Sequence, residues 1–181
     1  LTKVTTFDGV NPRQRIDELR SQARTDYFDI MLLHWQRGPS WPHETNGWQD
    51  AIDEAQHRGV VKARGASVHG LPALAQVPTF NWLQVAMIRC NHKGTRMDTP
   101  VADSPENGNV PEVVQRIHQA RAAGMGVLSM KLVGEGVFNR EDRQKAMRFA
   151  FRTAKVDAVT VGYKNNAEID EAIENINMAF V

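Results

Sequence analysis

Polar and ionisable side chains stand at the ends of several short apolar runs in this sequence. The clearest case is Asp29–His34, where a nearly continuous apolar run ends in an imidazole. Imidazole titrates at about pH 6.5, so small changes in its surroundings make it an acid, a base or a neutral hydrogen-bond donor. Other polar residues at or just past such ends are Lys3, Ser67, His69, Arg89, Asn91, Lys131 and Lys164. If the runs are parallel strands, these side chains meet at one edge and can form a small-molecule site. The alternative for His34 is a hydrogen-bonded histidine of the core.

The composition excludes several classes of protein. The chain has 181 residues, with 22 Lys plus Arg against 21 Asp plus Glu, so it has no basic excess and we expect no nucleic-acid binding. One cysteine, Cys90, excludes an intrachain disulfide framework and a site built on several thiolates. No apolar run approaches the roughly 18 residues of a membrane span, so we expect none.

Apolar, β-branched runs alternate with segments of helical period. We expect strands near residues 1–5, 29–34, 60–68, 82–88, 126–131 and 156–161. Helices are expected from Pro12, over 47–59, from about Leu71, from Pro111, over 141–153 and over 166–176. Residues 89–110 lack periodicity and predict a long loop of the kind that is often functional. Six strand–helix units predict a parallel sheet with right-handed crossovers.

The fold class expected is α/β, in one domain over residues 1–181, because no linker or composition shift divides the chain. An open doubly wound sheet and an eight-unit barrel of about 250 residues compete. No glycine-rich nucleotide fingerprint follows a strand, since Gly134-Glu135-Gly136 lacks a third glycine. Six units therefore suit a TIM barrel that lacks its first two units. The start at Leu1 without methionine leads us to expect further residues upstream.

Five segments carry a resemblance to a known family. The stretch Asp26–Trp35 resembles the D-Y-(I/L)-D-x-x-x-(I/L)-H-W motif of the aldo-keto reductases, and Leu1-Thr2-Lys3 resembles the strand before it. Ala51–Gly70 resembles the family's helix and strand that end in G-(V/A)-S, and Val159–Lys164 resembles its last strand. Met130–Gly136 is similar to a divergent bacterial branch. The resemblance covers essentially the whole chain, as the third to eighth units.

The resemblance implies an oxidoreductase that reduces an aldehyde or ketone, its small-molecule partner, with NADPH. By motif match, Lys3 is the lysine that lowers the pKa of the proton-donating tyrosine, and His34 is the histidine that orients the carbonyl group. Trp35 and Trp41 follow His34 and line a substrate pocket or pack beneath the loop. The resemblance assigns cofactor binding to Ser67, His69, Asn91, Met130, Lys131, Lys164, Asn165 and Glu168. Of these, Lys164 and Asn165 match the place that binds the 2′-phosphate, although Lys164 is equally well a solvated loop lysine.

Some positions depart from the family pattern. Its aspartate and tyrosine belong to units upstream of Lys3, and the two tyrosines present, Tyr27 and Tyr163, match neither position. The asparagine expected after Ser67 is replaced by Val68-His69, and Met130 stands where a tyrosine stacks on the nicotinamide.

These departures keep two alternatives open. One is a catalytically inactive barrel that binds a nucleotide or a protein partner. The other is a metal-dependent hydrolase built on His34, His69 and Lys131, although no strand ends in the Asp or Glu that would complete its ligands, so we expect no metal. We expect a cytoplasmic protein, or a periplasmic one if an export signal precedes Leu1. The sequence indicates neither the substrate nor the oligomeric state, and we expect Arg89, as a loop arginine, to be exposed.

Overall fold

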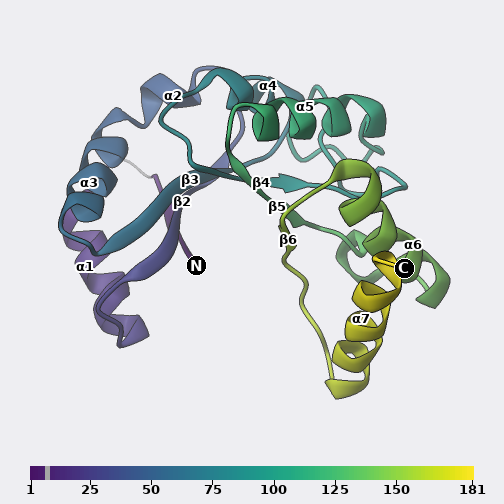
Figure 1. Cartoon of the computed structure of the whole chain (residues 1–181). Coiled ribbons are helices and arrows are strands. Elements are labelled where there is room, and N and C mark those ends of the chain that lie inside the picture. Colours follow the sequence, from purple (N-terminus) through teal and green to yellow (C-terminus); the bar gives the residue numbers. More distant parts are fainter. Residues whose placement is uncertain (7–8) are drawn as a thin grey trace.

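Six parallel strands form one sheet in consecutive order in the computed structural model, which describes residues 1–6 and 9–181 (Figure 1). The strands are β1 (Thr2–Thr5), β2 (Phe28–Gln36), β3 (Val61–Val68), β4 (Val85–Arg89), β5 (Gly126–Met130) and β6 (Ala158–Val159). A doubly wound sheet reverses its strand order at a switch point, whereas a barrel adds each strand beside the last. The consecutive order confirms the predicted part-barrel.

Helices follow the strands along the outside of an arc, with the sheet inside it (Figure 1). They are α1 (Pro12–Ala23), α2 (Trp41–Glu44), α3 (Asn46–His57), α4 (Leu71–Leu74), α5 (Val110–Ala122), α6 (Arg140–Arg148) and α7 (Asn166–Ala179). Short 3-10 turns, η1 (Val77–Thr79) and η2 (Gly134–Gly136), and a π turn, η3 (Phe149–Ala154), complete the described elements. In the described part of the chain, no helix is both long enough and apolar enough to cross a membrane.

Asparagine side chains begin four of the longer helices. Asn11, Asn109, Asn139 and Asn165 each accept a hydrogen bond from the backbone N–H three residues on, at the starts of α1, α5, α6 and α7. This bond satisfies one of the N–H groups that a helix start leaves without a partner.

Two expected elements differ from the structure. The helix expected over residues 141–153 ends as α6 at Arg148 and continues as the π turn η3. The strand expected over 156–161 is only the two-residue β6, because it pairs with β5 alone, at Ala158 and Val159.

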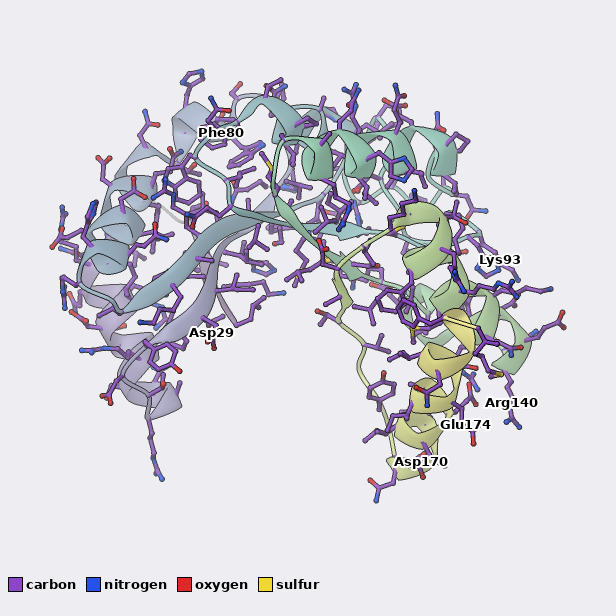
Figure 2. The ribbon with its side chains drawn as sticks, viewed as in Figure 1. Asp29, Phe80, Lys93, Arg140, Asp170 and Glu174 are labelled. Atoms are coloured by element: carbon purple, nitrogen blue, oxygen red, sulfur yellow. The ribbon has the colours of Figure 1, made fainter. Side chains whose placement is uncertain are left out.

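Charged side chains cover the outer surface of the arc (Figure 2). There, Arg140 of α6 lies beside Glu174 of α7, with 3.7 Å between Nη2 and Oε2. Both side chains are largely exposed, so this pair contributes little to stability. The packing between the helices and the sheet carries the fold.

Alternation along the strands gives the sheet two buried faces. Met31 and Leu33 of β2 join the large core beneath the helices. Leu32 instead joins a second apolar cluster with Val85, Met87 and Met130, on the inner face of the sheet. A strand between two apolar layers reads as a continuous apolar run, which is why Met31–Leu33 lacks alternation in the sequence.

Gly65 lets β3 and β4 approach each other at the inner face. A Cβ atom at this position would lie 1.9 Å from the carbonyl oxygen of Val85 and 2.8 Å from Cδ2 of Leu32. Only glycine fits without movement of the backbone.

Candidate active site

The inner face of the sheet carries polar side chains where its apolar cluster ends. Along a strand, side chains two residues apart lie on the same face. His34 therefore follows Leu32, Arg89 follows Met87, and Ser67 follows Gly65, each toward the carboxyl end of its strand. This end is where barrel enzymes build their sites.

Lys3, His34 and Lys131 influence one another electrostatically at this end. Burial, followed by the charge of Lys3, lowers the pKa of His34, so the imidazole is neutral at pH 7. Burial and the charge of Lys131 lower the pKa of Lys3 in turn. Lys3 and Lys131 also line the same cavity. The structure thus brings together the two residues, Lys3 and His34, on which the sequence interpretation depends.

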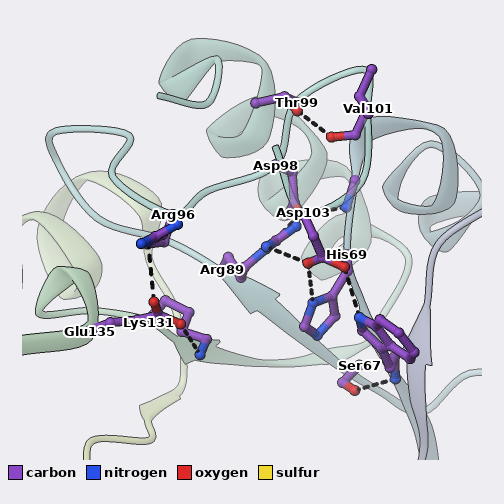
Figure 3. A network of polar contacts seen from close by, with 12 residues as sticks. Ser67, His69, Arg89, Arg96, Asp98, Thr99, Val101, Asp103, Lys131 and Glu135 are labelled. Atoms are coloured by element: carbon purple, nitrogen blue, oxygen red, sulfur yellow. Dashed lines mark hydrogen bonds and ion pairs between the residues drawn. The ribbon is translucent and has the colours of Figure 1, made fainter. Parts of the chain in front are cut away.

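A second imidazole, His69, lies just beyond the end of β3. Its ring is edge-on to that of His34, with 6.4 Å between the centroids. Its Nδ1 lies 3.3 Å from Oδ1 of Asp103 (Figure 3). Burial and the neighbouring guanidinium of Arg89 lower the pKa of His69 to about 4, against the opposing effect of Asp103. Two neutral histidines therefore lie at the rim of the sheet at pH 7.

Arg89 is buried, contrary to the expectation of an exposed loop arginine. Its Nε and Nη2 donate to Oδ1 of Asp98 at 2.9 and 2.7 Å, and its Nη1 donates to Oδ1 of Asp103 at 3.1 Å (Figure 3). Asp98 is completely buried and also accepts the backbone N–H of Gly70 at 2.6 Å. The arginine thereby fastens the loop of residues 90–109 to the turn after β3, because charge-assisted bonds of this kind are strong.

Asp98 and Asp103 are functional candidates that sequence reasoning missed. The only signal for them was the length of the loop that contains them. Their partners lie 9 to 68 residues away along the chain, and no local pattern indicates such contacts.

A hydrogen bond joins the backbone of Trp35 to the side chain of Ser67. The N–H of Trp35 donates to the buried Oγ of Ser67 at 3.0 Å, and the indole Nε1 donates to Oδ2 of Asp103 at 2.9 Å. The ring is 39% exposed, and the guanidinium of Arg37 lies 3.9 Å from its centroid. Trp35 is thus an exposed aromatic surface at the rim.

Trp41, expected as a possible substrate contact, lies in the core. It is 1% exposed, packs edge-on to Phe80 and donates its Nε1 to the carbonyl oxygen of Ala73. Of the two alternatives, the structure supports packing beneath the loop, and a substrate role for Trp41 is wrong in this geometry.

Asn91, expected to bind the cofactor, uses its side chain within the loop. Its amide nitrogen donates to the carbonyl oxygens of Thr95 and Lys131, and its amide oxygen accepts from the N–H groups of Lys93 and Thr95. The side chain is completely buried and has four partners. It holds the loop beside the end of β5 and has no capacity left for a ligand.

A cavity of about 570 Å³ extends from the inner face toward the start of α7. Lys3, Met130 and Lys131 line one part of it, and Gly162 and Lys164 line another. Nζ of Lys131 lies 2.5 Å from Oε1 of Glu135, which holds the pKa of that carboxyl below its usual range.

Side chains at the start of α7 accept hydrogen bonds from the backbone N–H groups there. Oδ1 of Asn165 accepts the N–H of Glu168 at 3.0 Å, and Oε2 of Glu168 accepts the N–H of Lys164 at 2.9 Å. Asn165 and Glu168 thus cap the helix beside the cavity, while the side chain of Lys164 lines the cavity.

Neither tyrosine has the surroundings of an activated phenol. Tyr163 lines the cavity, but burial raises its pKa, the opposite of what an adjacent ammonium group would do. Tyr27 is exposed and precedes β2, so it lies at the opposite end of that strand from His34.

The hydrolase alternative gains no ligand set from this geometry. Across residues 1–6 and 9–181, no group of three or more His, Cys, Asp or Glu side chains is arranged to hold a metal ion. The carboxylate that contacts His69, Asp103, is occupied by Arg89, His69 and Trp35.

Comparison with known proteins identifies the fold. No protein-family model matches the chain. Methylglyoxal reductase DkgA of Yersinia pestis is 22% identical over 135 residues, which cover 65% of this chain and 48% of that protein. The chain thus spans about half the length of this curated relative.

Solved structures agree over nearly the whole chain. A proposed aldo-keto reductase from Pseudomonas aeruginosa superposes with a TM-score of 0.76 at 17% identity, covering 99% of this chain and 64% of that one. The holo form of aldo-keto reductase AKR11C1 from Bacillus halodurans gives 0.71 at 13% identity, covering 97% and 66%. The chain has the aldo-keto reductase fold, as part of a barrel, and the resemblance seen in the sequence is confirmed.

Proposed function

We propose, from the aldo-keto reductase fold of this chain, that it forms part of an NADPH-dependent oxidoreductase that reduces an aldehyde or ketone to an alcohol. The observation that carries the proposal is that Lys3, which lines the cavity, lies close enough to the neutral imidazole of His34 for its charge to lower the pKa of that imidazole. A lysine and a neutral histidine at the end of a barrel core are suited to polarising a carbonyl oxygen.

His34 is the proposed donor to the substrate. As a neutral imidazole, it presents an N–H group to the carbonyl oxygen and stabilises the negative charge that develops there. A protonated imidazole would instead be repelled by Lys3, whose charge already lowers the pKa of His34. Lys3 adds positive charge to the same site and would lower the pKa of a phenol placed beside it.

The cavity suits a nicotinamide cofactor, which when bound supplies the hydride for the carbonyl carbon. Lys131 and Lys164 provide cations for phosphate groups, and the thioether of Met130 provides a polarizable surface at the inner face. Ser67 lies near the carboxyl end of β3, and His69 directly follows that strand. Lys164 is the proposed partner of the 2′-phosphate, which distinguishes NADPH from NADH.

Titration of the purified chain with NADPH, followed by tryptophan fluorescence, tests this proposal. We expect saturable binding that Lys164→Gln weakens for NADPH but not for NADH. Lys155→Gln, a change at a lysine that does not line the cavity, is the control. Absence of binding to either nucleotide would contradict the proposal.

Reduction requires a proton donor as well as a hydride. Because neither Tyr27 nor Tyr163 matches the position of the family's proton donor, we expect no aldehyde reduction by the 181 residues alone. Activity with an activated aldehyde is expected in a longer form that supplies a strand-end aspartate and a tyrosine.

A barrel that binds the nucleotide without catalysis is the second candidate. The replacement of the usual asparagine by His69 and of the stacking tyrosine by Met130 favours it. It predicts NADPH binding without turnover in every form of the protein, and steady-state assay of the longer form separates the two.

A further inference from the structure

Two side chains at the end of β3 differ in what they can offer a bound molecule. Ser67 is completely buried, and its Oγ accepts the N–H of Trp35. His69, two residues on, directs Nδ1 toward Oδ1 of Asp103. A carboxylate oxygen only accepts, so the hydrogen of the neutral ring lies on Nδ1.

The other ring nitrogen of His69 is then an acceptor. In a neutral imidazole, one nitrogen donates and the other carries a lone pair. Within the described residues, Nε2 has no hydrogen-bond partner, yet it is not one of the fully buried side-chain atoms left without a partner. The lone pair on Nε2 therefore reaches the surface at the rim, near His34.

Asp103 has the contacts of a residue that orients others. It is 38% exposed, so it does not fill the core. Its Oδ1 accepts from Arg89 and His69, and its Oδ2 accepts from Trp35 (Figure 3). Arg89 holds the carboxylate in place, and the same carboxylate oxygen holds the imidazole.

We propose that Asp103 is a positioning residue that fixes the hydrogen of His69 on Nδ1, so that Nε2 accepts an N–H or O–H group from a molecule bound at the rim. The identity of that molecule rests on the proposed function. The donor is either the amide N–H of a nicotinamide cofactor or a hydroxyl group of the carbonyl substrate.

Nitrogen-15 NMR of the histidine rings tests the role of Asp103 directly. In the unsubstituted chain, we expect His69 to carry its hydrogen on Nδ1 at pH 7. Asp103→Ala removes the acceptor, so the hydrogen should move substantially to Nε2. Asp103 raises the pKa of His69, whereas burial, Arg89 and His34 lower it. In Asp103→Ala, the pKa of His69 should therefore fall below about 4.

Two further variants separate positioning from folding. Asp103→Asn keeps an oxygen that can face both Arg89 and His69, so it should preserve the Nδ1 hydrogen. Glu106→Gln, an exposed charge change in the same loop, should leave the ring spectrum unchanged. A hydrogen already on Nε2 in the unsubstituted chain, or an Asp103→Ala spectrum identical to it, would overturn the positioning role.

Ligand titrations identify the donor. NADP⁺ carries the amide N–H, whereas its 3-acetylpyridine analogue lacks it, and glyceraldehyde carries a hydroxyl group beside a carbonyl. If the amide is the donor, NADP⁺ but not the analogue shifts the Nε2 resonance. NADP⁺ should then bind about tenfold more tightly than the analogue. His69→Phe should remove that preference.

The other outcomes also decide the question. A shift with glyceraldehyde alone assigns the acceptor to the substrate hydroxyl and supports the proposal. Quenching of tryptophan fluorescence by NADP⁺, with no ligand moving the Nε2 resonance, overturns the acceptor role while the proposed function stands. If NADP⁺ does not bind at all, the proposed function fails, and the variant spectra still decide the role of Asp103.

Discussion

Arg89 and Asp98 form a buried ion pair in which two guanidinium nitrogens meet a single carboxylate oxygen, at 2.9 and 2.7 Å. Arg89 ends β4 and Asp98 lies within the loop that follows it. The pair, with the bond from the N–H of Gly70, connects that loop to the strand ends that carry His34 and His69.

Loss of Arg89 should destabilise the protein strongly. Arg89→Met leaves the carboxylate of Asp98 buried without its cation, which should lower the free energy of unfolding by about 3–5 kcal/mol. Urea denaturation measures the change. Arg121→Met, at an ion pair with Asp157 in which both side chains are more than a third exposed, should cost less than about 1 kcal/mol. Equal losses in the two variants would contradict the structural role of Arg89.

Gly65 should not tolerate even alanine. The added Cβ would lie 1.9 Å from a backbone oxygen of β4, so the strands must separate, at a cost of about 3 kcal/mol. Gly126→Ala is the matched control, because its Cβ would meet β4 only at 3.8 Å. Thermal unfolding of both variants should show a large loss for the first and a small change for the second.

The state of His34 should depend on Lys3. Lys3→Met removes a positive charge that lowers the pKa of the imidazole, so that pKa should rise. Proton NMR titration of His34 measures the shift. Lys62→Met, a change at a lysine over the ring of Tyr27, should leave it unchanged. A fall in the pKa of His34 in the Lys3 variant would be incompatible with the two groups sharing a site.

Stability should fall with acid through His69. Its pKa is about 4 in the folded protein and 6.5 in the unfolded chain, so between these values the unfolded state binds the extra proton. The free energy of unfolding is therefore highest above pH 6.5 and falls by roughly 3 kcal/mol as the pH drops toward 4. His69→Gln should flatten the stability curve in this window. A curve as steep as that of the unsubstituted chain would assign the acid sensitivity to other groups.

Sequence patterns predicted the scaffold well because its determinants are local or periodic. Pro12 opens α1, and Gly59, at a φ of +75°, follows the end of α3. The run that ends at His34 is a strand between two apolar layers, as its continuous hydrophobicity indicated. Lys3 and His34 could be placed together because parallel strands align their ends.

The loop of residues 90–109 could not be interpreted in this way. The burial of Arg89 depends on Asp98 and Asp103, which have no periodic relationship to it. Asn91 matches a family position, but its side-chain capacity is consumed by neighbouring backbone groups. The burial of Trp41 was likewise not evident from the sequence, because it depends on the contact of its ring with Phe80 in the core.

The three donors that meet on Asp103 come from three consecutive strand ends, at Trp35, His69 and Arg89. A fluctuation that breaks one of these bonds weakens the alignment that holds the other two. The rim should therefore open as a single cooperative unit, with amide hydrogens at all three positions exchanging with solvent at a common rate rather than fraying one by one.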